Sequence, residues 1–300
     1  MSPRKIFEND GEQRQHEKTC GLLRRAMFSG GKAREVAKAE LQKHPGREVH
    51  ETIVDLRVKR ELLAVDLEEL KAACDHFWKD ALRPGTSHSK ECALQRAVWR
   101  RAFHVAHASE SLTESIVASG RRFAKRKRAK GRTQYEFTVA EFGSRWERLE
   151  KSPLFQFNRA LRGALFHSRL VNPDWVGHID FEGGTRHERF VLKKSVLYTS
   201  ARWVLEARQY IEENSVASDG SRDSRRPAVG LDLLDHFTRY AGEIGAFLDW
   251  FLAEMARPEF GASLGFSRHA LAEYIDWRLE VTSVPSEMAL CEYCGHPYKL

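Results

Sequence analysis

Residues 50–82 have the sequence HETIVDLRVKRELLAVDLEELKAACDHFWKDAL, and this stretch decides the fold. Its main apolar residues recur at steps of three, four or seven: Ile53, Leu56, Leu63, Leu67, Leu70, Cys74 and Phe77. This spacing predicts one apolar stripe along a long amphipathic helix. The helix should end at Arg83-Pro84-Gly85, because Pro disfavours the helical conformation in the residue before it and Gly permits a turn.

Helical patterns also cover most of the remaining chain. Ser152-Pro153 is a typical helix start, because Ser is a favoured N-cap and Pro is favoured at the first helical position. The helix that it opens should run to His167 or Leu170, before Asn172-Pro173 stops it. Further helices are expected at about residues 12–43, 92–122, 139–150, 195–213, 231–256 and 267–280.

The pattern changes to a period of two over residues 175–192. Apolar residues alternate with polar ones on both sides of Glu182-Gly183-Gly184-Thr185, which predicts a short hairpin and the only one in the chain. Residues 214–226 are rich in Ser, Asp and Arg and are expected to form a surface loop. We therefore predict a mostly all-α fold with one β-hairpin insertion: a single helical domain over 1–282, followed by a tail at 283–300.

The composition excludes several classes of protein. The 300 residues include 17 Phe and 7 Trp, enough aromatic residues to build a core, so a disordered chain is not expected. Five cysteines are too few for a disulfide scaffold, and their odd number favours a reducing compartment. Because no stretch approaches the length of a membrane span and the N-terminus has no apolar signal region, we expect a cytoplasmic protein without a membrane partner.

The strongest candidate for a functional site lies at residues 157–169, with the sequence FNRALRGALFHSR. Arg162 and His167 lie about 140° apart on such a helix, outside the apolar stripe, and form part of a cationic face. Asn158, Arg159 and Arg169 are candidate substrate-binding residues beside them. The structural alternative is a set of solvated arginines with a histidine that the helix dipole stabilises.

Residues 161–169, LRGALFHSR, resemble the RxxxxH motif of the HEPN superfamily, and the predicted layout of helices and hairpin over about residues 50–255 agrees with this. The resemblance implies a helical bundle that forms homodimers. It also implies a metal-independent ribonuclease, often a toxin or antiviral defence effector, with Arg162 as phosphate clamp and His167 as general acid or base. The family usually has a polar residue after the arginine, whereas this chain has Gly163.

The residue types suit RNA cleavage without a metal. A histidine, with an ordinary pKa of about 6.5, can take the proton of a ribose 2′-hydroxyl near neutral pH. A guanidinium can hold two oxygens of the developing phosphorane, which lysine cannot do. No cofactor is then required.

A second candidate is the basic run at residues 121–132. Eight of these twelve residues are basic and none is acidic, and the chain as a whole has a net charge of +7. Such a run can contact several phosphates, so RNA is the expected partner. The candidate contacts are Arg121, Arg122, Lys125, Arg126, Lys127 and Arg128. The alternative is a solvated helix end followed by a loop.

The third candidate is the CxxC pair Cys291 and Cys294 in the tail, which is similar to half of a zinc knuckle. A tetrahedral zinc site would need two further ligands, and an ordinary tail or a redox dithiol are the alternatives.

The sequence thus favours a HEPN-type RNA endonuclease, for which a neutralising or regulatory protein would be a further partner. The alternatives are a non-catalytic module that binds nucleic acid or protein, and a structural subunit of a larger assembly.

Overall fold

The computed structural model describes these ranges: 46–81, 83–129, 132–167, 174–180, 185–200, 204–217, 228–265, 288–290 and 297–299, with a few single positions before residue 46. The described residues are 78% helical, which confirms the mostly-α prediction. None of their helices is both long and apolar enough to cross a bilayer. The helix expected at 267–280 lies outside the described residues, and so does the helix expected at 12–43 apart from a few single positions.

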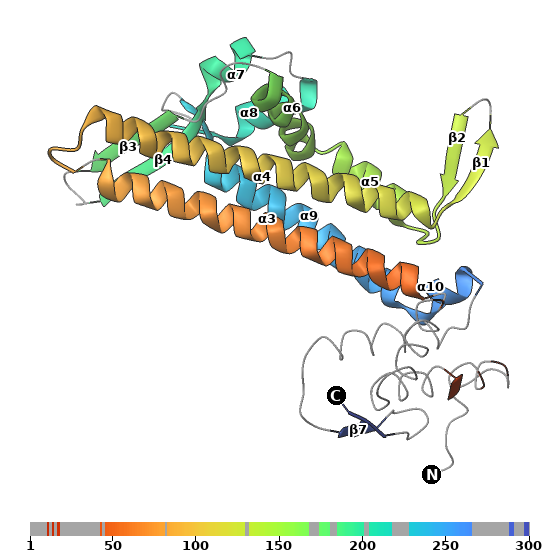
Figure 1. The fold of residues 1–300 in the computed structure, drawn as a ribbon. Helices are drawn as coiled ribbons and strands as arrows, with labels where there is room; N and C mark the ends of the chain where they lie inside the picture. Colours follow the sequence, from red (N-terminus) through yellow and green to blue (C-terminus); the bar gives the residue numbers. More distant parts are fainter. Residues whose placement is uncertain are drawn as a thin grey trace. The chain divides into compact units, whose positions relative to one another are not determined.

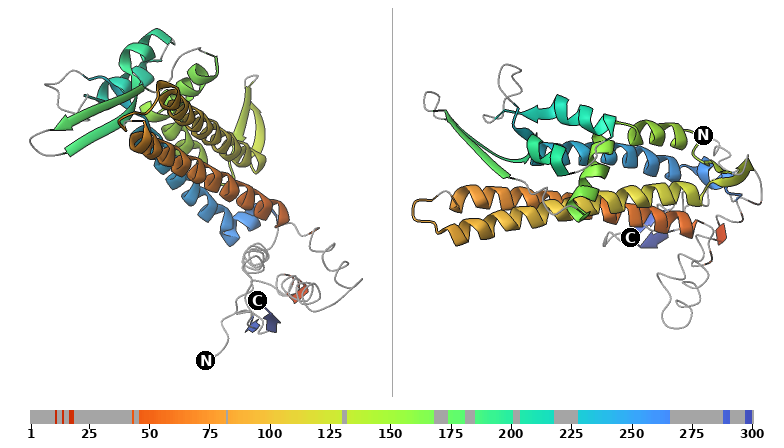
Figure 2. Two further views of the ribbon diagram at one scale, coloured as in Figure 1. Left: turned by 60° about the vertical axis from the view of Figure 1, so that its left-hand side comes forward. Right: turned by 90° about the horizontal axis from the view of Figure 1, so that it is seen from above.

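Two long helices, α3 (Arg47–Asp80) and α4 (His88–Arg122), confirm the predicted ranges to within a few residues. The predicted stripe of α3 is buried, with Leu56, Leu70 and Phe77 fully covered, although Leu67 is only half-buried. Gly85 has a φ of 85° in the turn between the two helices, a conformation that glycine adopts without steric cost. Figures 1 and 2 show the two helices side by side. Lys59 Nζ donates a hydrogen bond across this pair to Ser115 Oγ at 2.5 Å.

The shorter helices are α5 (Phe142–Glu150), α6 (Pro153–His167), α7 (Lys194–Ser200), α8 (Leu205–Asn214), α9 (Leu233–Ala256) and α10 (Pro258–Ser263). The predicted starts and stops hold to within a few residues for α5, α6 and α9. The single helix expected at 195–213 is wrong, because Val204 has an extended backbone and α8 begins anew after it. Ser152 Oγ accepts a hydrogen bond from the Phe155 amide at 3.4 Å, as expected for the N-cap of α6. The short helix α10 was not predicted, because six residues show too little of the helical period.

The predicted hairpin is confirmed as β3 (Asp174–Asp180) and β4 (Thr185–Lys193), which pair antiparallel. It belongs to a four-stranded sheet of order β3-β4-β6-β5, to which β6 (Gly230–Asp232) and β5 (Ser215–Val216) were not predicted to contribute. A Cβ on Gly230 would lie 2.3 Å from the Leu192 carbonyl oxygen, so β4 and β6 approach closely only with glycine there. The surface-loop prediction for 214–226 is wrong at its start, because residues 214–217 are buried.

A second hairpin shows that the prediction of a single hairpin in the chain is wrong. The basic run forms β1 (Lys125–Ala129), which pairs antiparallel with β2 (Arg132–Glu136). Consecutive basic residues carry no alternation of apolar and polar positions, so the sequence had no period-two signal there. In the tail, β7 (Met288–Leu290) pairs with β8 (Pro297–Lys299).

The chain divides into two compact units, each assembled from separate segments. The first contains residues 1–56, 118–142 and 249–300, and Phe142 packs in its core with the ring of Phe251 at 4.8 Å. The second contains residues 57–117 and 143–248, with α6, the four-stranded sheet and a core that includes Phe157 and Leu161. The prediction of one helical domain over 1–282, with a separate tail, stays a prediction.

Candidate functional site

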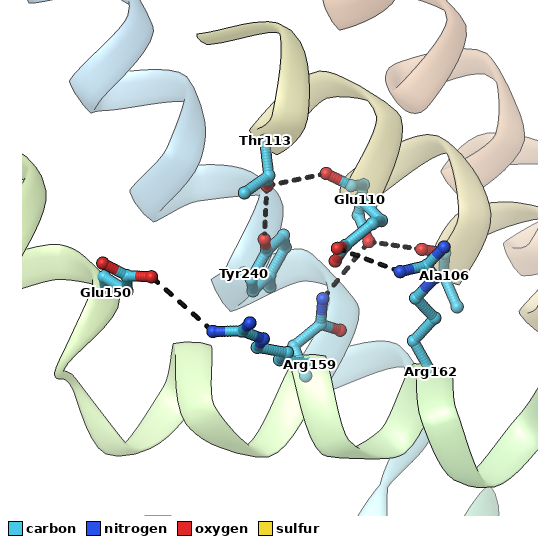
Figure 3. A network of polar contacts seen from close by, with 9 residues as sticks. Ala106, Glu110, Thr113, Glu150, Arg159, Arg162 and Tyr240 are labelled. Atoms are coloured by element: carbon cyan, nitrogen blue, oxygen red, sulfur yellow. Dashed lines mark hydrogen bonds and ion pairs between the residues drawn. The ribbon is translucent and has the colours of Figure 1, made fainter. Parts of the chain in front are cut away.

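Arg162, the predicted phosphate clamp, lies on α6 beside α4. Its Nη1 donates a hydrogen bond to Glu110 Oε1 on α4 at 3.0 Å (Figure 3). The arginine side chain is 35% exposed and the glutamate side chain 15% exposed. The guanidinium is therefore held by a carboxylate on its protein side, while about a third of the arginine side chain as a whole faces solvent.

His167, the predicted acid–base residue, is the last residue of α6. Five residues of helix place its Cα about 7.5 Å along the axis from that of Arg162. The His167 side chain and the whole of Arg169 lie outside the described part of the chain.

Asn158 is not placed to bind a substrate, and this part of the predicted site is corrected. Its side chain is only 1% exposed. Its Nδ2 donates to Ser109 Oγ at 3.2 Å, and its Oδ1 accepts a hydrogen bond from His236 Nε2 at 3.3 Å. The amide therefore satisfies two buried partners within the protein.

His236 extends this network on its other side and is 1% exposed. Its Nδ1 accepts a hydrogen bond from the Tyr210 hydroxyl at 3.1 Å, and its ring meets that of Phe157 edge to face at 4.9 Å. Burial, with a smaller contribution from Arg239, lowers the pKa of His236 to about 3. The imidazole is therefore neutral, with its proton on Nε2. We name Ser109, Asn158, Tyr210 and His236 the buried polar cluster.

Sequence reasoning missed this cluster. The available signal was a histidine next to Phe237 inside the apolar pattern of residues 231–256, which indicates a buried position but not its partners. A neighbouring pair adjoins the cluster: Thr113 Oγ1 donates to the Ser109 carbonyl at 2.8 Å and accepts from the Tyr240 hydroxyl at 2.8 Å (Figure 3). Burial raises the pKa of Tyr240 well above its usual value.

The remaining arginine on α6 is Arg159, whose side chain is 69% exposed. Its Nη1 lies 3.6 Å from Glu150 Oε1, and Figure 3 shows this ion pair. An exposed pair of this kind is largely solvated, so Arg159 is placed where a polyanion can reach it.

The basic run belongs to the first unit, whereas Arg162 belongs to the second. Arg121 and Lys125 are exposed, and Arg122 donates a hydrogen bond to Thr52 Oγ1 at 3.2 Å. The backbone of Arg126, Lys127 and Arg128 forms part of β1, but their side chains lie outside the described part of the chain.

The predicted zinc ligands Cys291 and Cys294 lie outside the described residues. Within the described residues, no group of three or more His, Cys, Asp or Glu side chains is arranged to hold a metal ion.

Comparison of the chain with protein-family models, with curated proteins and with solved structures finds no match.

Proposed function

We propose that this protein is a metal-independent RNA endonuclease of HEPN type, with Arg162 and His167 as its catalytic residues. The observation that carries the proposal is the partly exposed side chain of Arg162, whose guanidinium pairs with Glu110. Arg162 lies five residues before the histidine that ends the same helix.

The ion pair with Glu110 supports a phosphate-binding role for Arg162. A guanidinium carries five N–H donors in a fixed plane, so a carboxylate that engages Nη1 sets the direction of the whole group. An arginine oriented before substrate arrives loses less conformational entropy when it binds the scissile phosphate. The arrangement suits stabilisation of the charge that develops on the phosphorane.

In the proposed reaction, His167 accepts the proton of the ribose 2′-hydroxyl as the oxygen attacks phosphorus. The bond from phosphorus to the 5′-oxygen breaks, and a protonated histidine donates a proton to that oxygen. The products are a 2′,3′-cyclic phosphate and a 5′-hydroxyl. In a homodimer, the second histidine would come from the other copy. A cytoplasmic toxin or defence role would follow from such an activity, together with control by a neutralising protein.

The second candidate function is a non-catalytic module that binds RNA or protein. The observation that favours it is Gly163, which has no side chain at the position where the family usually has a polar one. A Cβ built on Gly163 meets no atom within 4 Å, so the absence of a side chain there is not imposed by packing.

Incubation of purified protein with RNA in EDTA separates the two functions. The enzyme proposal expects cleavage that leaves cyclic phosphate ends and is lost in both Arg162→Ala and His167→Ala. Arg208→Ala, which removes an exposed arginine on α8, is the matched control and should keep full activity. Cleavage that survives both site substitutions would contradict the assignment. RNA binding without cleavage, lost when residues 121–132 are neutralised, would support the binding module.

A further inference from the structure

Helix α4 has a solvent-facing ridge of arginine and histidine side chains. Between residues 96 and 107 its exposed positions are Arg96, Arg100, His104 and His107, and none of them is acidic or apolar. They follow one another at steps of four, four and three residues, so they lie within about 80° of one another around the helix. We name these four residues the α4 track, which rises roughly 16 Å along the helix.

The two arginines of the α4 track keep their charge available to a ligand. Arg96 Nε donates a hydrogen bond to the Cys92 carbonyl oxygen at 3.2 Å, which leaves the charge and the other N–H donors of its guanidinium unused. Among the described residues, no carboxylate lies within ion-pair distance of Arg96 or Arg100. The next arginine, Arg101, differs from them because it points to α3 and pairs with Glu69.

One end of the track lies beside the candidate site. His107 precedes Glu110 by three residues, so the two lie about one helical turn apart, and Glu110 accepts the hydrogen bond of Arg162 Nη1 at 3.0 Å (Figure 3). The track also belongs to the same compact unit as α6. Beyond His107, the next exposed position on the ridge is Glu114, whose carboxylate ends the run of basic and imidazole groups.

We propose that the α4 track binds the backbone phosphates of a single-stranded RNA whose scissile phosphate lies at Arg162. Its arginines pair with phosphates, and its histidines donate hydrogen bonds to phosphate oxygens, which an imidazole can do in either protonation state. A row one side chain wide follows one strand of backbone. This inference rests on the proposed function, because it takes RNA as the ligand, but it requires only binding and not cleavage.

An anionic membrane fits the track less well than RNA. A helix that lies on a membrane needs an apolar face that enters the lipid beside its basic residues. The exposed positions of the track offer no apolar side chain for this purpose. An acidic protein is the remaining polyanion, and the experiment below separates it from RNA.

Fluorescence anisotropy of a labelled single-stranded RNA tests the track. The full chain carries His167→Ala in every sample, so that cleavage does not disturb the binding curve. Arg96→Glu combined with Arg100→Glu should weaken binding by about 30-fold, because two phosphate contacts become repulsive. The matched control is Arg57→Glu combined with Arg208→Glu, which changes the net charge equally at exposed arginines on α3 and α8 and should weaken binding by less than about 3-fold.

The salt dependence of the same curves distinguishes direct contacts from overall charge. Each phosphate neutralised on a single strand contributes about 0.7 to the slope of log Kd against log salt concentration. The track variant should therefore lose about 1.4 from this slope, whereas the control variant should keep it. Equal losses of affinity in the two variants, or an unchanged slope in the track variant, would overturn the proposal.

Two further outcomes separate this inference from the proposed function. Track-dependent binding by a protein that cleaves no RNA would overturn the nuclease and keep the track. RNA cleavage by wild type with binding that ignores the track substitutions would do the reverse. Polyglutamate that competes as well as unlabelled RNA, or a parent protein that binds no RNA, would also overturn the track. Circular dichroism of each variant, compared with the parent, checks that the fold is retained.

Discussion

Asn158 and Arg162 lie one helical turn apart on α6, and both bond to α4, but their surroundings differ. Asn158 is 1% exposed and joins the buried polar cluster, whereas the Arg162 side chain is 35% exposed and pairs with Glu110. The two positions differ by only about 40° around the helix. That rotation separates a residue that stabilises the fold from one that can meet a ligand.

The contrast also separates two kinds of polar interaction. The amide of Asn158 has left water entirely, so its partners must be present within the protein. The Arg162–Glu110 pair remains partly solvated. Its removal should therefore destabilise the fold less than removal of the Asn158 amide, but should reduce the rate of a reaction that uses the guanidinium. The following predictions test this division, from the largest effect to the smallest.

Replacing Arg162 with lysine should reduce RNA cleavage by about 100-fold, because lysine keeps the positive charge but loses the planar fork that can hold two phosphate oxygens. Cleavage rates with saturating RNA measure the effect. Urea unfolding of the same variant should stay close to that of wild type. Full activity in Arg162→Lys would show that charge alone is needed and would contradict the clamp.

Replacing Asn158 with leucine should lower the free energy of unfolding by about 2–3 kcal/mol, because His236 Nε2 would lose its acceptor inside the core and Ser109 Oγ would lose the donor that Asn158 supplies. Urea unfolding followed by circular dichroism provides the measurement. Arg159→Ala, at the exposed pair on the same helix, is the control and should change stability by less than about 1 kcal/mol. Equal losses in the two variants would contradict the distinction between buried and exposed positions.

The buried polar cluster should also make stability depend on pH through His236. Its pKa is about 3 in the folded protein and near 6.5 when unfolded, so the unfolded state alone binds the proton between these values. Stability should therefore fall as pH decreases from about 6.5 towards about 3, and this residue should contribute no pH dependence above that window.

Urea unfolding of wild type and His236→Gln at several pH values isolates that contribution. Glutamine cannot titrate, so the stability advantage of wild type should shrink as the pH falls through the window. A constant difference between the two proteins at all pH values would show that His236 is not held neutral.

The smallest effect is expected at Gly163. Replacement by alanine should stabilise the protein by about 0.5–1 kcal/mol, because glycine inside a helix loses more backbone entropy on folding and no atom lies within 4 Å of the added Cβ. Thermal unfolding measures the change. Destabilisation by alanine would show that the added methyl group meets packed side chains on this side of α6.

The sequence predicted those parts of the fold that carry a long period or a strong breaker. This is how the sequence predicted the stripe of α3, the start of α6 at Ser152-Pro153 and the hairpin over residues 175–192. The strands β5 and β6 were missed because two or three residues show no alternation. The hairpin β1–β2 was missed because its basic residues have no apolar face.

By itself, the sequence determined the helical class, the major helix boundaries, and the presence of Arg162 and His167 on one helix, because these depend on interactions among residues close along the chain. Only the tertiary structure decided that Asn158 points into the core and that Glu110 meets Arg162. It also showed that the four residues of the α4 track lie on the face of α4 that is left exposed. These outcomes depend on which helix faces pack together, and the pairing of residues distant in sequence is not encoded in the period of either helix alone.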